Sequence, residues 1–362
     1  MNSIDASLKK EGITVLKSLD TLTINSIAKK IATLLCSSFP EQDLNYNEIF
    51  IAISRLNMYI AEMPQDMAVA KYYYKNSSIY LSNKMNFNHL DKCLIHECIH
   101  ALQTKRNIKN DVVTLGLCDF SRSKMPGMSL NEAAVQLTTE HCINSKVDSV
   151  KYYGIELSTI SPDYYPLECT IINQMAYITG KAALFNSTLY GNKVFENTFI
   201  SLTSKKCFYT VQKNMDLIIS LEENIAILNS KLEGGQVTSK TAFKIANQII
   251  QVKNAITTLF IRTQNLILTT YFDEYFCRIQ TSKDIENLRN KLYQYKNYIG
   301  VTDNYTFFND YYLDMMSLLE KKYDELNGIT TLPTIYTANK FKTIFNKLKN
   351  FFAGENSIDY SK

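Results

Sequence analysis

The feature that most constrains this chain is the sequence His-Glu-x-x-His at residues 96–100. Residues four apart lie on one face of a helix, so a helical stretch would present His96 and His100 together as two imidazole ligands of one metal ion. Glu97 stands beside that pair, where it can reach a water molecule on the metal without being a ligand itself. The pattern is typical of a zinc hydrolase in which the metal is the Lewis acid and the glutamate the general base.

The residues around the motif favour the helix that this chemistry needs. Asn88 is a suitable N-cap, and Asp91 would then stand in the first turn, where a negative charge is favourable. Lys105 and Arg106 follow at the other end, where positive charge is favourable. The alternative, that both histidines are ordinary core residues, needs a chance pairing in a chain with only four histidines.

Length and composition indicate an ordinary globular protein. At 362 residues the chain is long enough for two domains, and its net charge of +4 gives no indication of a nucleic-acid partner. We find no secretory signal and no apolar run long enough to span a membrane, so we expect a cytoplasmic protein without a transmembrane segment, with signal-independent export left open. The eight cysteines form no Cys-x-x-Cys pair, which favours reduced thiols.

The hydrophobic period changes along the chain. Helical spacing before the motif is followed by stretches with strand character, and from residue 166 onward the pattern is helical. The expected fold class is α+β, mainly α, with a small antiparallel sheet. Besides the motif helix, the expected helices are at 20–36, 45–55, from about 129 onward, 166–185, 187–203, 205–232, 238–279, 283–298, 303–326 and 338–352, and the expected strands are at 57–63, 71–75 and 78–82.

Residues 107–128 are expected to form a loop-like connection, and 146–166 a loop or short strand. Apolar residues in steps of three and four over 205–232 and 238–279, with Gly234-Gly235 between them, predict an antiparallel helical hairpin. The hairpin would be either a projecting arm or part of an α-helical core.

The expected organisation is in three parts. A metal-binding catalytic domain would cover residues 1–150, a helical domain residues 151–353, and a flexible tail residues 354–362. One face of the predicted helix at 338–352 is apolar and the rest basic, so it could rest on an anionic membrane or a protein partner, or pack on the helical domain.

A catalytic zinc usually has three protein ligands and an open position for water. A metzincin would need Gly at position 103 and His at 106, and this chain has Gln103 and Arg106. With Ser129-Leu130-Asn131-Glu132-Ala133 downstream of the His-Glu-x-x-His sequence, the chain resembles the glutamate-zincins (gluzincins), the thermolysin-like metallopeptidases. The resemblance covers roughly residues 50–145.

The resemblance implies one zinc ion per chain, with His96, His100 and Glu132 as ligands and Glu97 as the general base. It also implies a zincin-like core of small sheet, motif helix and ligand helix, followed by an all-helical domain. Residues 78–82 would correspond best to the edge strand on which the substrate backbone lies. The resemblance implies hydrolysis of peptide bonds in a peptide or protein substrate.

Two alternatives for the third ligand remain open. Ser129 and Glu132 also fit a capping box, in which the glutamate would only bond back to its own helix start. Alternatively, the third ligand is Glu140 or His141, and Glu140 could instead support the site from outside.

This chain departs from the family pattern in two ways. The gap from His100 to Glu132 is longer than in thermolysin-like enzymes and nearer to that of clostridial neurotoxin light chains. The aspartate expected four residues after the ligand glutamate is replaced by Gln136, which can accept the hydrogen bond of a ligand histidine but carries no charge.

The mechanism also calls for a group that stabilises the oxyanion. Family members often use a tyrosine or histidine for this, and the tyrosine candidates here are Tyr152, Tyr153, Tyr164 and Tyr165. Cys98 is expected in the core, and Cys118 is a weak candidate for an inhibitory thiolate ligand.

Three functions are weighed. The first is a zinc-dependent peptidase, and the second is a non-enzymatic helical interaction protein with a structural or vestigial zinc site. The third is a peptidase effector aimed at one host protein. A fourth protein ligand would favour the second function, and an open coordination position would favour a peptidase.

Overall fold

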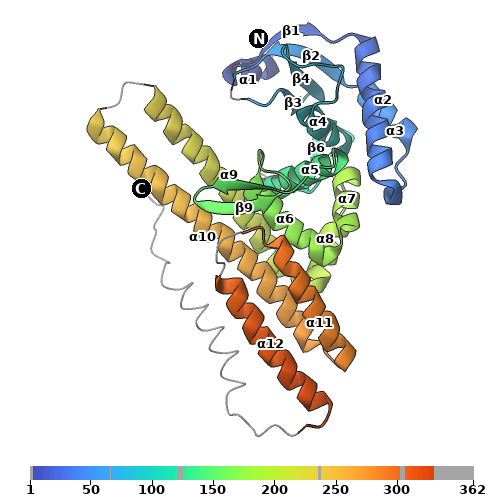
Figure 1. Cartoon of the computed structure of the whole chain (residues 1–362). Helices are drawn as coiled ribbons and strands as arrows, with labels where there is room; N and C mark the ends of the chain where they lie inside the picture. The colour runs from blue at the N-terminus through green and yellow to red at the C-terminus, as the bar shows by residue number, and fades with distance from the viewer. Residues whose placement is uncertain (1–2, 66, 121–124, 235–237, 302–305, 330–362) are drawn as a thin grey trace.

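The computed structural model describes residues 3–65, 67–120, 125–234, 238–301 and 306–329 (Figure 1). Within them the chain is mostly helical, with one mixed sheet of four strands and two smaller antiparallel sheets. This confirms the expected class, α+β and mainly α.

The four-stranded sheet lies at the N-terminal end of the molecule. Its strands run in the order β1-β2-β4-β3, where β2 and β4 are parallel and the other neighbours antiparallel. The expectation of a purely antiparallel sheet is therefore wrong for one pair. Its strands are β1 (Thr14–Ser18), β2 (Asn57–Glu62), β3 (Ala70–Tyr73) and β4 (Ser78–Ser82).

The strand order corrects the choice of substrate-binding strand. β4 is paired on both sides, with β2 and with β3, so residues 78–82 cannot form an edge. The edge strands are β1 and β3, and β3 is the one that packs beside the helix that carries the histidine motif. β1 was not expected because all five of its residues are exposed, which leaves no alternation of buried and exposed positions to detect.

Helices with apolar stripes pack on this sheet. Ile27, Ile31 and Leu35 of one helix share a buried cluster with Ile79 and Leu81 of β4. Each such side chain contributes roughly 1.5–3 kcal/mol by leaving water. The helices of this part are α1 (Ser3–Lys10), α2 (Thr21–Ser38), the 3-10 turn η1 (Pro40–Gln42), α3 (Tyr46–Ser54) and α4 (Lys92–Gln103).

The segment after α4 contains more structure than a loop. A small antiparallel sheet forms from β5 (Thr104–Arg106), β6 (Val112–Leu115) and β7 (Cys118–Asp119), and α5 (Met128–Cys142) follows. The β5–β6 connection closes at Asn110, whose φ of 66° is one that asparagine tolerates. The loop-like connection expected at 107–128 is therefore wrong for β6 and β7.

The rest of the described chain is a β-hairpin followed by helices. The helix expected over 166–185 is divided in two at Gly180, whose φ of 86° does not fit a helix. The elements are β8 (Asp148–Tyr152), β9 (Ile155–Thr159), α6 (Pro166–Thr179), α7 (Lys181–Tyr190), α8 (Val194–Leu202), α9 (Lys205–Glu233), α10 (Ser239–Cys277), α11 (Ser282–Tyr295), the 3-10 turn η2 (Lys296–Tyr298) and α12 (Thr306–Leu326).

α9 and α10 form the long helical hairpin that the sequence predicts (Figure 1). Toward its free end Ile225 and Leu228 of α9, with Ile245 and Ile249 of α10, are buried. Nearer the rest of the molecule both helices belong to the large core, while the free end extends beyond it (Figure 1). The hairpin is thus core at its base and a projecting arm at its tip.

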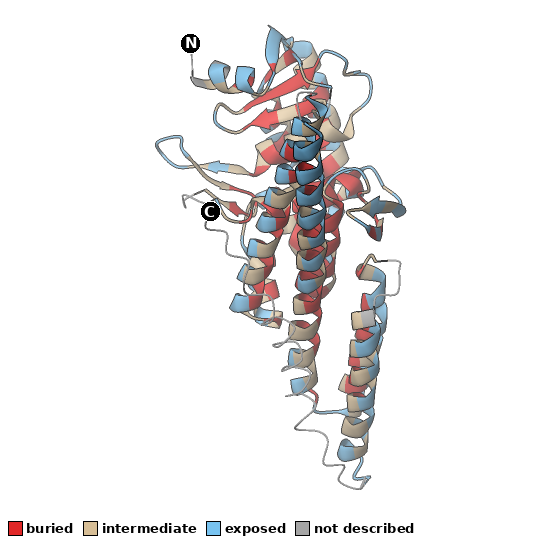
Figure 2. Cartoon of the chain, turned by 90° about the vertical axis from the view of Figure 1, so that its left-hand side faces the viewer, coloured by how far each residue is buried: buried red, intermediate tan, exposed pale blue. Residues whose placement is uncertain are grey.

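Two large hydrophobic cores meet along α5. Val135 and Cys142 of α5 pack into the core with the four-stranded sheet, whereas Leu130, Ala134 and Leu137 pack into the helical core. Across the molecule, buried residues lie on the faces of helices and strands that point inward, and exposed residues lie on the faces that point outward (Figure 2). α5 is therefore held from both sides, which fixes the position of any side chain that it contributes to a site.

Within the part of the chain that the structure describes, no helix is long and apolar enough to cross a membrane. The basic amphipathic helix expected at 338–352 and the tail at 354–362 lie outside the described residues. The boundary expected near residue 150 stays a prediction.

Candidate metal centre

α4 presents the two histidines of the motif on one buried face. The helix begins at Lys92, because Asp91 is its N-cap and accepts a hydrogen bond from the backbone N–H of Cys93 at 2.7 Å. The start is thus three residues later than an Asn88 cap would give. His96 and His100 keep the four-residue spacing that places both rings together.

α5 carries Glu132, and the way in which this helix begins shows whether Glu132 is available as a metal ligand or is used as a helix cap. The N-cap is Gly127, and the backbone N–H groups of Gly127 and Ser129 donate to the Asp216 carboxylate of α9 at 2.9 and 3.0 Å. The capping box of Ser129 and Glu132 therefore does not form. Glu132 is free to face α4.

Three ligand atoms converge between α4 and α5. The His96 Nε2–His100 Nε2 distance is 2.9 Å, and Glu132 Oε2 lies 3.3 Å from His96 Nε2 and 3.4 Å from His100 Nε2. In a tetrahedral site with ligand distances of about 2.0–2.2 Å, ligand atoms are about 3.3–3.5 Å apart. The three separations are close to these values, so the triangle is of a size that could hold a zinc ion.

The chemistry of the triangle also calls for a cation. His96 Nδ1 lies 3.0 Å from Gln136 Oε1, an oxygen that can only accept, so this nitrogen carries the proton and Nε2 carries a lone pair. The Nε2 lone pair of His96 therefore faces the Glu132 oxygen and the second imidazole. A proton or a metal ion is needed to hold such acceptors together.

The second histidine is supported by a pair of buried amides. Gln103 Nε2 lies 2.8 Å from His100 Nδ1, while Gln103 Oε1 is buried without a hydrogen-bond partner among the described residues. A 180° rotation of this amide gives the oxygen a donor, His100 Nδ1–H, and leaves Nε2 of His100 free to bind a metal. Asn131 joins this group: its Oδ1 accepts from the backbone N–H of Leu117 at 3.0 Å.

Gly116 makes room for these amides. A Cβ at this position would lie 2.0 Å from Gln103 Oε1 and 2.2 Å from Asn131 Oδ1, and its φ is 54°. Glycine alone has no Cβ to clash with these amides and adopts a positive φ without strain. Gln103 follows His100 by three residues on α4, so its place was detectable from the sequence; that of Gly116 was not.

Glu97 lies next to the triangle and faces the edge strand β3. Its Oε2 accepts a hydrogen bond from the backbone N–H of Tyr72 at 2.7 Å. Loss of solvent around the carboxyl raises the pKa of Glu97 to about 7, against the opposing effects of His96 and the Tyr72 N–H. A carboxyl with a pKa near neutral can both accept and return a proton.

Glu132 has the opposite character. Burial tends to raise the pKa of this carboxyl, but in the metal-free chain the charge and hydrogen bonds that His100 and His96 provide when protonated outweigh burial and lower the pKa well below its ordinary value. Glu132 is therefore a carboxylate at any ordinary pH, as a metal ligand must be.

Of the four candidate tyrosines, Tyr165 is the one at the site. The negative charge of Glu132, followed by burial and the charge of Glu97, raises the pKa of its phenol well above the ordinary value, which indicates that the phenol lies near both carboxylates. Tyr165 has a φ of 51° and stands directly before Pro166, an unusual backbone conformation at a cost of roughly 1–3 kcal/mol.

The other tyrosines lie elsewhere. Tyr164 contacts Cys93 Sγ at 3.8 Å, and Tyr152 and Tyr153 interact with Glu222 and Glu168.

The alternative ligands are not at the triangle. Glu140 bonds to Gln136 and Ser145, and His141 Nε2 lies 3.1 Å from the Ser38 carbonyl oxygen. Among the described residues, His96, His100 and Glu132 are the single group of three or more His, Cys, Asp or Glu side chains that could hold a metal ion.

The two cysteines are not in this group either. Cys98 is fully buried on α4, as expected of a core residue. Burial raises the pKa of Cys118 to about 12, so it remains a neutral thiol and is a poor metal ligand.

Comparison of the chain with protein-family models, with curated proteins and with solved structures finds no match. The chemical nature of this site is therefore inferred from its own residues and their geometry.

Proposed function

We propose that this protein is a zinc-dependent peptidase of the glutamate-zincin type. The observation that carries the proposal is the triangle of His96, His100 and Glu132 with Glu97 beside it and, within the described residues, no fourth ligand group. Structural zinc sites are closed by four protein ligands, whereas catalytic sites leave one position open.

The donor set favours zinc over magnesium and calcium. Two imidazole nitrogens and one carboxylate oxygen form a mixed nitrogen and oxygen set, whereas magnesium and calcium prefer oxygen ligands alone. When bound, zinc would polarise a carbonyl group and make a water molecule more acidic. His96, His100 and Glu132 would hold it in place.

Glu97 is the group that moves the proton. Its pKa of about 7 suits a residue that takes a proton from the attacking water and then delivers it to the leaving amine. The hydrogen bond from the Tyr72 N–H fixes one carboxylate oxygen, so the side chain is held on the β3 side of α4.

Tyr165 is the candidate donor to the oxyanion. Its phenol keeps its proton because neighbouring negative charges and burial raise its pKa, so it can donate a hydrogen bond. The charges of Glu132 and Glu97 both contribute to this shift, which supports a position of the phenol near the triangle.

The substrate backbone would lie along β3. This strand stands at the edge of the sheet and supplies the Tyr72 N–H that binds Glu97. An extended peptide beside β3 would therefore pass the general base, in the manner of strand addition to a sheet edge.

The competing function is a helical interaction protein with a structural or vestigial zinc site. The long hairpin is compatible with it. The open fourth position and the pKa of Glu97 favour the peptidase, because a purely structural site needs neither.

Metal analysis tests the first half of the proposal. Wild-type protein should carry one zinc per chain, and Glu132→Ala and His96→Ala should lose it. His89→Ala is the matched control, because His89 is exposed and outside the triangle. Absence of zinc from the wild type, or full retention in Glu132→Ala, contradicts the proposed site.

Peptide cleavage tests the second half. Wild-type protein should cleave members of a quenched-fluorescence peptide library, and Glu97→Gln should retain zinc while losing turnover by about 10²–10⁴-fold. A zinc-loaded wild type that cleaves no peptide or folded protein offered to it would instead support the interaction protein.

A further inference from the structure

A row of buried polar side chains leads from His96 away from the metal triangle. His96 Nδ1 lies 3.0 Å from Gln136 Oε1, and Gln136 Nε2 donates to Glu140 Oε1 at 2.6 Å. The other Glu140 oxygen accepts from the Ser145 hydroxyl. The row ends at the C-terminal end of α5, two helical turns from Glu132.

Glu140 decides which way the Gln136 amide points. A carboxylate oxygen can only accept, so the amide nitrogen must face Glu140 and the amide oxygen must face His96. That oxygen in turn can only accept, so His96 must carry its proton on Nδ1. Nε2 is then left unprotonated at the triangle, as a metal ligand requires.

Burial strengthens the influence of Glu140 on the orientation of the Gln136 amide. Glu140 is 4% exposed and Gln136 3% exposed, so their hydrogen bonds are largely shielded from bulk water. A buried carboxylate without partners would cost several kcal/mol, and here both oxygens are satisfied by the two hydrogen bonds. The Glu140–Gln136 pair therefore takes the place that a single aspartate would occupy beside a ligand histidine.

We propose that Glu140 is a positioning residue for the metal centre, acting through Gln136 to fix the tautomer and orientation of His96. The inference rests on the proposed function for its consequence, zinc binding. Its immediate effect, the protonation of His96 Nδ1, is a property of the metal-free chain as well.

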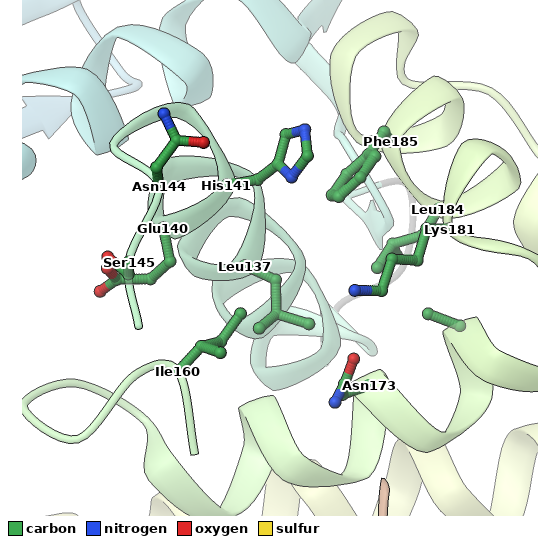
Figure 3. A pocket seen from close by; sticks show the side chains of 11 residues that line it. Leu137, Glu140, His141, Asn144, Ser145, Ile160, Asn173, Lys181, Leu184 and Phe185 are labelled. Atoms are coloured by element: carbon green, nitrogen blue, oxygen red, sulfur yellow. Dashed lines mark hydrogen bonds between the residues drawn. The ribbon is translucent and has the colours of Figure 1, made fainter. Parts of the chain in front are cut away.

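A cavity gives separate access to Glu140. It has a volume of about 230 Å³ and lies between α5, α6 and α7, with Leu137, Ile160, Asn173 and Lys181 on its walls (Figure 3). The Glu140 carboxylate points toward Ser145 at one side of it (Figure 3). The cavity exceeds the volume of several water molecules at about 30 Å³ each, so a formate ion can enter a space left by truncation of Glu140.

The test uses full-length protein and zinc alone. Glu140→Ala should weaken zinc affinity, measured by competition with a chelator, by about 10- to 100-fold. Glu140→Gln keeps an acceptor for Gln136 but no charge, so its loss should be smaller. Thr139→Val is the matched control, since Thr139 is buried next to Glu140 and its hydroxyl has no partner among the described residues.

Two readouts separate positioning from mere support of the fold. Formate should restore affinity in Glu140→Ala and leave the wild type and Thr139→Val unchanged. In metal-free protein labelled with ¹⁵N-histidine, the His96 signals should show the Nδ1-protonated form in the wild type and a mixture of tautomers in Glu140→Ala. With only four histidines the spectrum is simple to assign.

If Glu140→Ala fails to fold, the double variant Gln136→Glu/Glu140→Gln serves instead. It exchanges the two groups with little change in volume, places a carboxylate directly against His96, and should bind zinc at least as tightly as wild type.

Zinc affinity within about twofold of wild type in Glu140→Ala, with an unchanged His96 tautomer, would overturn the inference while the proposed function stands. If wild-type protein binds no zinc, the proposed function fails, and the tautomer of the metal-free variants still decides the role of Glu140.

Discussion

Gly116 lies against two amides that support the candidate metal centre, so its replacement by alanine tests how the local backbone holds that site. Its φ of 54° is a conformation that costs an alanine roughly 1–2 kcal/mol. In addition, the new Cβ would lie 2.0 Å from Gln103 Oε1 and 2.2 Å from Asn131 Oδ1, so both amides must move. Their flexible ends can move, but only by giving up buried hydrogen bonds.

The size of the expected loss of stability follows from those hydrogen bonds. Gln103 holds His100 at 2.8 Å and Asn131 holds the Leu117 N–H at 3.0 Å, and each bond is worth about 1 kcal/mol. Gly116→Ala should therefore lower the free energy of unfolding by about 3–4 kcal/mol. Loss of the His100 partner should also weaken zinc affinity by about 10- to 100-fold.

Gly154→Ala is the matched control for the backbone term. Gly154 also has a positive φ, 86°, in the turn between β8 and β9, but an added Cβ there meets no atom within 4 Å. We expect this variant to lose only about 1–2 kcal/mol and to bind zinc as the wild type does. Urea denaturation and chelator competition measure both quantities. A Gly116→Ala variant as stable as Gly154→Ala, with normal zinc affinity, would refute the reasoning.

Two further predictions concern Tyr165 and a buried carboxyl outside the triangle. Tyr165→Phe should keep its zinc and lose about 10²–10³-fold in kcat, because one oxyanion donor is removed; an unchanged kcat would show that the phenol has no such role. Burial raises the pKa of Glu168 from 4.5 to about 7, so the folded state holds a proton that the unfolded chain has already lost in that interval. The contribution of Glu168 to the free energy of unfolding should therefore fall as the pH rises from about 4.5 to about 7, in addition to that of Glu97, whose pKa is also raised to about 7. Glu168→Gln, which cannot ionise, should flatten this dependence in urea denaturation at about pH 5 and about pH 8, and an identical slope in both proteins would contradict it.

The sequence predicted the elements whose signal is local. The spacing of His96 and His100 follows from helical geometry alone, and the hairpin of α9 and α10 follows from its apolar period and the Gly234 break. The sequence failed where pairing partners are distant. β1 has no buried alternation, and β6 and β7 are too short to carry a period.

Glu140 shows most clearly the difference between what the sequence predicts and what the structure adds. Its sequence position allowed it to be a ligand or a support, because helical spacing gives a direction but not the neighbours at its end. The structure gives the neighbours, Gln136 and Ser145, and these exclude the first possibility.

By itself, the sequence determined that the imidazoles of His96 and His100 and the carboxylate of Glu97 lie close together on one helix. Residues one and four positions apart have fixed relative directions on any α-helix. Only the tertiary structure decided that Glu132 faces them. The start of α5 is held by Asp216 of a distant helix, and no local pattern shows that a cap comes from elsewhere. It also decided that β3, not β4, is an edge strand and that Tyr165 is the tyrosine at the site. Both depend on contacts between segments far apart in the chain, which packing of the whole molecule creates.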